Sequence, residues 1–153
     1  MASQIAITLK NLSSALKRLG IFDNVSTVEP KGAPGAGSNA ALFLASVEPA
    51  VASSGLNQAD GLYTFTLRLY TDMLREPAAN IEPELAALVD KVMDALMGDF
   101  DLGETVRNVD FLGENGQRVR AEAGYIEVNG KMFRIVDVSL PLVVSNAFTE
   151  YAE

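Results

Sequence analysis

Gly32, Gly35 and Gly37 lie close together and invite comparison with a phosphate-binding loop. A P-loop requires Gly-Lys-Ser/Thr at the start of a helix, but here Ser38-Asn39 comes after Gly37 and leads into an apolar strand pattern. The Rossmann glycine spacing is also absent. The pattern favours a flexible loop over a nucleotide site.

Asp99, Asp101 and Asp110 occupy positions one, three and twelve of a possible calcium loop. The sixth position should be glycine to allow the sharp turn, but it is Glu104, and a strand pattern replaces the second helix. Solvated carboxylates beyond a helix end explain these residues better.

Two further residue patterns could in principle support catalysis. Ser14 and Lys17 match the S-x-x-K nucleophile pair, but no S-D-N or K-T-G element accompanies them. We expect both on the solvent face of a helix. Glu82 and Glu84 are paired carboxylates suited to acid–base work, but they stand at a helix start, where the helix dipole already favours them.

The chain contains no histidine and no cysteine, which excludes Ser-His-Asp and Cys-His triads, disulfides and the usual zinc sites. The absence of cysteine fits synthesis in a reducing cytoplasm. We therefore predict a protein that is not an enzyme and uses no cofactor or metal. The net charge of −8 argues against binding nucleic acid through its phosphates. No signal peptide or membrane span is apparent.

The elements can be predicted from hydrophobic periodicity. Gly61–Arg75 alternates over an unusual length, with Tyr63, Phe65, Leu67 and Leu69 on one face, which predicts a long strand projecting beyond its own core. A partner subunit would be the simplest cover for such a strand.

The remaining segments predict two helices and several strands. Helical stripes cover Gln4–Leu19, ending at Gly20, and about Ile81–Met97, ending at Gly98. We expect strands at Val25–Val28, Ala40–Val47, Thr105–Leu112, Tyr125–Val128 and Met132–Leu142, the last two joined by an Asn129-Gly130 turn. Pro141 predicts an edge position or a bulge.

This order predicts a single α+β domain spanning residues 1–153, in which two amphipathic helices pack on an antiparallel or mixed sheet. Residues 30–39 and 48–60 are expected to be mobile loops, and residues 146–153 a flexible end.

Four segments resemble the tail terminator proteins of long-tailed, siphovirus-type bacteriophages, above all those of actinobacterial phages. These segments are APGAGSNAALFLASVEPAVASSGL, LRLYTDMLREPAANIEPELAALVDKVMDAL, GDFDLGETVRNVDFLG and AEAGYIEVNGKMFRIVDVSLPLVV. The resemblance covers Ala33 to Val144.

The resemblance implies a tail-tube-like fold and a structural role in the virion. Tail terminators form a homo-hexameric ring at the head–tail junction, stop polymerisation of the tail tube protein and meet the head connector or head-completion protein. DNA passes through the lumen without specific binding, which an acidic lumen would favour. A tail-completion or tube protein is the main alternative, and a small-ligand binding module is a weaker one.

A closed ring needs two different contact patches on each subunit. We expect one at Tyr63–Met73 and the other on the helix Pro83–Met97 or at Asn146–Glu153. The residues predicted for these contacts are Tyr63, Phe65, Arg68, Tyr70, Pro34, Gly35, Phe148 and Tyr151.

Overall fold

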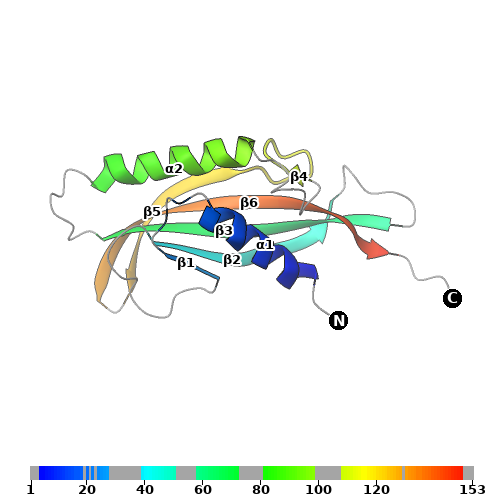
Figure 1. Ribbon diagram of the computed structural model, residues 1–153, viewed down its shortest axis with the longest axis horizontal. Coiled ribbons are helices and arrows are strands. Elements are labelled where there is room, and N and C mark those ends of the chain that lie inside the picture. Colours follow the sequence, from blue (N-terminus) through cyan, green and yellow to red (C-terminus); the bar gives the residue numbers. More distant parts are fainter. Residues whose placement is uncertain are drawn as a thin grey trace.

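The computed structural model describes residues 4–18, 20, 22, 24–27, 39–50, 58–72, 81–98, 108–128 and 130–149. Within them two helices and six strands succeed one another along the chain (Figure 1). They are α1 (Gln4–Arg18), β1 (Asn24–Ser26), β2 (Asn39–Pro49), β3 (Gln58–Asp72), α2 (Ile81–Gly98), β4 (Asn108–Val109), β5 (Arg120–Val128) and β6 (Lys131–Thr149).

The described strands form one mixed sheet in the order β1-β2-β3-β6, with β4 and β5 both paired to β6. The β1–β2 pairing is parallel, and the other described pairings are antiparallel. β5 pairs with Lys131–Ser139 and β4 with Leu142 and Val143, so the two short strands lie one after the other along the same β6 partner.

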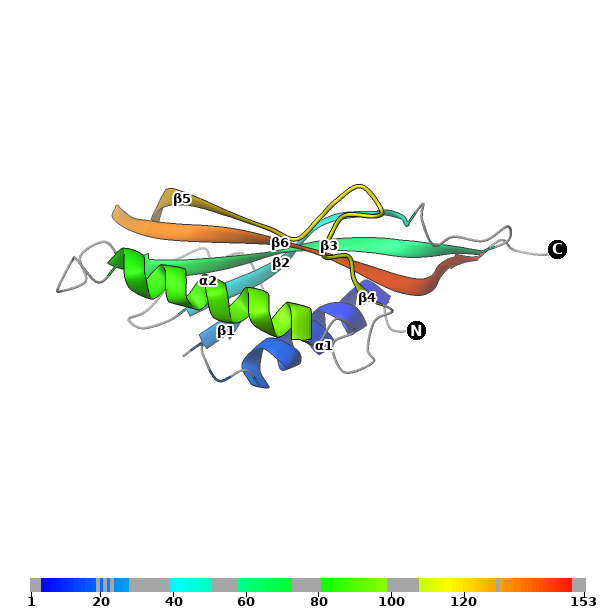
Figure 2. The same cartoon turned by 90° about the horizontal axis from the view of Figure 1, so that it is seen from above.

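Both helices pack on one face of the sheet, and the other face carries no described helix (Figure 2). The main core lies between these layers, where α1 contributes Leu12 and Leu16 and α2 contributes Leu85, Val92 and Leu96. The buried side chains of β3 in this cluster are Tyr63, Phe65, Leu67 and Leu69. The predicted α+β architecture is confirmed.

The helix ends are explained by local sequence. Gly20 has a φ of 68° and its N–H donates to the Lys17 carbonyl at 3.2 Å, which ends α1 as expected of a glycine after a helix. Pro83 lies in the first turn of α2, where its missing N–H leaves no helical bond unmade. Ser14 and Lys17 are exposed on α1, as predicted.

The long strand is central. β2 pairs with one edge of β3 from Gly61 to Tyr70, and β6 pairs with the other from Gln58 to Asp72. The expectation that a partner subunit covers this strand is therefore corrected, because strands of the same chain occupy both edges. Figure 1 shows that the end of β3 near Gln58 still extends past both helices.

Several predicted boundaries move. β2 continues through Pro49 and β3 begins at Gln58, so both strands extend into the expected 48–60 loop. β6 runs to Thr149 and includes four residues of the expected flexible end. The remaining parts of these segments, except Ala50, lie outside the described residues together with residues 30–38.

The region after α2 differs most from the prediction. Of the strand predicted over Thr105–Leu112, residues 105–107 lie outside the described residues and β4 covers Asn108 and Val109. A loop then runs from Asp110 to Val119 where the rest of the strand was predicted. The turn between β5 and β6 is as expected, with Val128 opposite Lys131 and a φ of 77° at Gly130.

Pro141 lies in a central strand, although proline predicts an edge or a bulge there. On the side of β6 that faces away from β3, Pro141 lies between Ser139, the last residue that pairs with β5, and Leu142, which pairs with β4. The Pro141 carbonyl still accepts a hydrogen bond from the Asp110 N–H at 2.9 Å. Because neither β5 nor β4 pairs with β6 at Pro141, the missing N–H of the proline leaves no strand pairing unmade there.

Candidate interaction surface

The helix-free face of the sheet has a polar centre, formed by neighbouring residues of β3 and β6. Arg68 binds Asp137 through two parallel hydrogen bonds, Nε to Oδ1 at 2.8 Å and Nη2 to Oδ2 at 3.0 Å. The Arg68 guanidinium also lies 5.5 Å from the centre of the Phe43 ring. The hydrogen bonding with Asp137 raises the pKa of Arg68 above its ordinary value, so this cation stays charged.

One end of this face is apolar. Tyr70 and Phe133 meet edge to face, with ring centres 6.0 Å apart and an interplanar angle of 88°, and Ala41 and Ile135 complete the buried cluster. Edge-to-face contact brings the positive edge of one ring to the negative face of the other. This end of the sheet is therefore held together by the chain's own side chains.

At the other end, the loop from Asp110 to Val119 rises over the helix-free face (Figure 2). The buried Asp110 carboxylate accepts hydrogen bonds from the backbone N–H groups of Glu114 and Asn115, both at 2.9 Å, and from Asn115 Nδ2 at 3.1 Å. The Val119 N–H closes the loop by donating to the Phe111 carbonyl at 3.2 Å. The loop is thus fixed from inside by one carboxylate.

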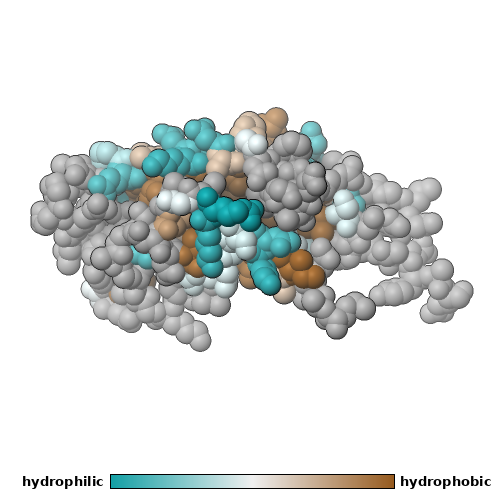
Figure 3. Space-filling model, in the orientation of Figure 1, coloured by the Kyte–Doolittle hydropathy of each residue, from teal (hydrophilic) through white to brown (hydrophobic). Residues whose placement is uncertain are grey.

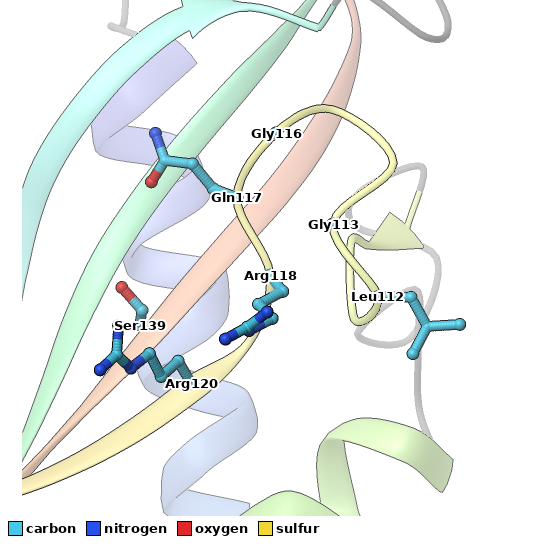
Figure 4. Close-up of a pocket in the computed structure, with 7 residues that line it drawn as sticks. All are labelled: Leu112, Gly113, Gly116, Gln117, Arg118, Arg120 and Ser139. Atoms are coloured by element: carbon cyan, nitrogen blue, oxygen red, sulfur yellow. The ribbon is translucent and has the colours of Figure 1, made fainter.

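This loop borders a cavity of about 330 Å³ that has polar walls. It is lined by Leu112, Gly113, Gly116, Gln117, Arg118, Arg120 and Ser139. Figure 4 shows Arg118 and Arg120 among the residues that line this cavity, together with Ser139. Two guanidinium groups and a hydroxyl can bind an anion such as a carboxylate or a phosphate.

The helix side has its own groove, of about 290 Å³, between α2 and β5. Arg134 closes one part of it by donating from Nε to Glu82 Oε1 at 2.6 Å and from Nη1 to the Gly124 carbonyl at 3.2 Å. Its guanidinium also lies 4.5 Å from the centre of the Tyr125 ring. Glu82 therefore serves as an ion-pair partner that joins α2 to the hairpin.

The structure places the predicted contact residues in different settings. Tyr63, Phe65 and Tyr70 are buried within the chain, whereas Arg68 lies on the helix-free face with a fifth of its side chain exposed. Phe148 pairs with Ala59 through the strand backbone. Pro34, Gly35 and Tyr151 lie outside the described residues.

A subunit contact through these positions stays a prediction. Arg68 is the charged residue among the predicted contact residues that the structure describes. The sequence predicted a solvated Asp110, but its carboxylate is buried and holds the loop from inside. The two arginines beside the cavity were not predicted as a site. The sequence feature that could have predicted this loop is the position of Asp110, five residues before Asn115-Gly116. An Asn-Gly pair by itself predicts only a hairpin turn.

Among the described residues, no group of three or more carboxylates could hold a metal ion. No described helix is long and apolar enough to cross a membrane. The most exposed large apolar side chains are Leu112 in the loop (82%), Tyr125 in β5 (59%) and Met97 at the end of α2 (58%).

No protein-family model and no curated protein matches the chain. Among solved structures, the chain is similar to one from a structure described as "Virion of native gene transfer agent (GTA) particle". The two share 18% identity over 93% of this chain and 94% of that one, with a TM-score of 0.36. A likeness at this score does not by itself assign a function to the chain.

Proposed function

We propose that this protein is a structural component of a phage virion that closes the completed tail tube as a ring. In this role it stops the addition of tube protein and presents a surface to the head connector or head-completion protein. The ring is a homo-hexamer at the head–tail junction, and DNA passes through its lumen without specific binding.

The observation that carries the proposal is the order of elements that resembles tail terminators. That order is a helix, a short strand, a long strand pair, an acidic helix and a terminal hairpin, which correspond to α1, β1, β2–β3, α2 and β5–β6. The extended end of β3 and β6 supports a role in contacts, because it lies beyond the helix layer (Figure 1).

A tube-elongation assay tests the role. Purified tail tube protein is allowed to polymerise, and this protein is added at increasing concentration while tube lengths are measured by electron microscopy. The proposal predicts shorter tubes with additional density at one end. Co-polymerisation along the whole tube would indicate a tube protein, and unchanged tubes would contradict both roles.

The cavity at Arg118 and Arg120 favours a second candidate, a module that binds a small anionic ligand. Concave sites with a few convergent polar groups are typical of small-ligand binding. Calorimetric titration with inorganic phosphate and with citrate tests this role. Binding abolished in the R118A/R120A variant would support it, and absence of heat change with either anion would argue against it.

A further inference from the structure

The two helices carry opposite charges. α1 exposes Lys10, Lys17 and Arg18 and contains no acidic residue. α2 exposes Asp90 and Asp94 along one side, and its first turn adds two glutamates, against a single lysine in the helix. Figure 3 shows hydrophilic side chains gathered over both helices. One layer of the molecule therefore presents a basic and an acidic surface side by side.

These charges are not neutralised by one another within the described part of the chain. Lys10, Lys17, Arg18, Asp90 and Asp94 make no ion pair with any described residue, whereas Glu82 of α2 does pair with Arg134 at 2.6 Å. Charges of both signs that stay in solvent on one molecule are available to a second copy.

The helices also lie toward different sides of the sheet. α1 contacts β1 and β2, while α2 contacts β3 and β6. When two copies lie side by side in the same orientation, the β1 edge of one faces the edge of the other that β4 and β5 form beyond β6. This arrangement brings the basic α1 of one copy toward the acidic α2 of its neighbour, and the same step repeats around a ring.

We propose that α1 of one copy docks on α2 of the next through this charge complementarity, forming the subunit contact of the ring. This inference rests on the ring assembly proposed above and assigns its two patches. Ile7, 42% exposed on α1, and Met97, 58% exposed at the end of α2, supply apolar surface at the same contact. The contact is heterologous, because it joins two different surfaces.

Exposed ion pairs are weak one by one and are screened by salt. The contact therefore depends on several pairs acting together, and association weakens as ionic strength rises. Complementary charge fixes which surfaces meet and how they are aligned.

Charge reversal with reciprocal rescue tests the contact. Variant one carries K10E/K17E/R18E, and variant two carries D90K/D94K; association is measured by sedimentation over a concentration series at low salt. Each variant alone is expected to associate about tenfold more weakly or worse than the wild type. An equimolar mixture of the two, or one chain carrying all five changes, is expected to recover association.

Because the chain has no cysteine, disulfide trapping gives a second measurement. Mixing S14C, on the exposed side of α1, with A87C, on the exposed side of α2, is expected to yield a heterodimer under mild oxidation. S14C alone should stay largely uncrosslinked. This measurement does not depend on whether a reversed variant folds, and circular dichroism checks the folding of the variants directly.

The outcomes separate this contact from the proposed function. Three results would each overturn the α1–α2 contact. The charge-reversed variants could associate like the wild type, the wild type could stay monomeric throughout the concentration series, or S14C homodimers could form as the main product. The tube-elongation assay is independent of these results. If the protein shortens tubes but the charge-reversed variants associate like the wild type, the terminator role is supported and the ring uses a different subunit contact.

Discussion

Gln117 donates a hydrogen bond from Nε2 to Glu48 Oε1 at 2.7 Å and so joins the Asp110–Val119 loop to β2 across the sheet. Glu48 lies opposite Leu62 of β3, which in turn lies opposite Val143 of β6. The loop must therefore pass over Leu62 and Val143, and both are almost fully buried although no described helix covers that face. The loop serves as the local cover of the sheet.

Removal of the Asp110 carboxylate should loosen this cover. D110A leaves three N–H donors without their acceptor, so we expect a loss of about 2–3 kcal/mol in the free energy of unfolding. Urea denaturation measures it. Q117A is the matched control, because its hydrogen bond to Glu48 is exposed, and it should cost less than about 0.5 kcal/mol. Equal losses in the two variants would contradict the role of Asp110.

Gly113 and Gly116 allow the effects of backbone strain and steric contact to be separated. Both have a positive φ, 82° and 101°, but a Cβ at Gly113 would lie 3.1 Å from Arg118 Cβ and 3.2 Å from its backbone N, whereas at Gly116 it would meet open space. We expect G116A to cost about 1 kcal/mol and G113A clearly more. Thermal unfolding ranks them, and G98A, which has neither feature, should be nearly neutral. The reverse order would contradict the loop geometry.

Thr64 carries a buried hydroxyl on the helix-free face, with its Oγ1 lacking a hydrogen-bond partner among the described residues. Replacing it with the isosteric valine removes an unsatisfied polar group, so T64V should stabilise the protein by about 1 kcal/mol. T64S, which keeps the hydroxyl but loses the methyl group, should be destabilising. Denaturation of both variants tests this, and a destabilised T64V would show that the hydroxyl has a partner.

Tyr63 should make stability fall at alkaline pH. Burial raises the pKa of its phenol, so the unfolded chain loses this proton at a lower pH than the folded chain. Stability from this group is complete below the unfolded pKa of about 10 and falls as pH rises above it. We expect Y63F to flatten the decline of unfolding free energy between about pH 9 and 11. An identical pH dependence in Y63F would exclude this contribution.

The helices and the terminal hairpin were predictable, because their signals are local. The apolar stripe of α1, the glycine after it and the Asn129-Gly130 pair each specify conformation within a few residues. The alternation from Tyr63 to Leu69 likewise identified the helix-covered face of β3.

The neighbours of β3 were not predictable in the same way. Strand length suggested a projecting element, but pairing partners depend on contacts between residues distant in sequence, such as Arg68 with Asp137. The role of Asp110 in the loop was missed because its carboxylate acts through side-chain hydrogen bonds to residues four and five positions later. An alternating pattern does not register that kind of interaction.

The proposed function places this protein at the head–tail junction of a virion. Gold-labelled antibody against it, applied to purified phage particles and viewed by electron microscopy, tests this placement most directly. We expect label confined to the junction. Label along the length of the tail, or no label on particles whose necks and tails are accessible, would contradict it.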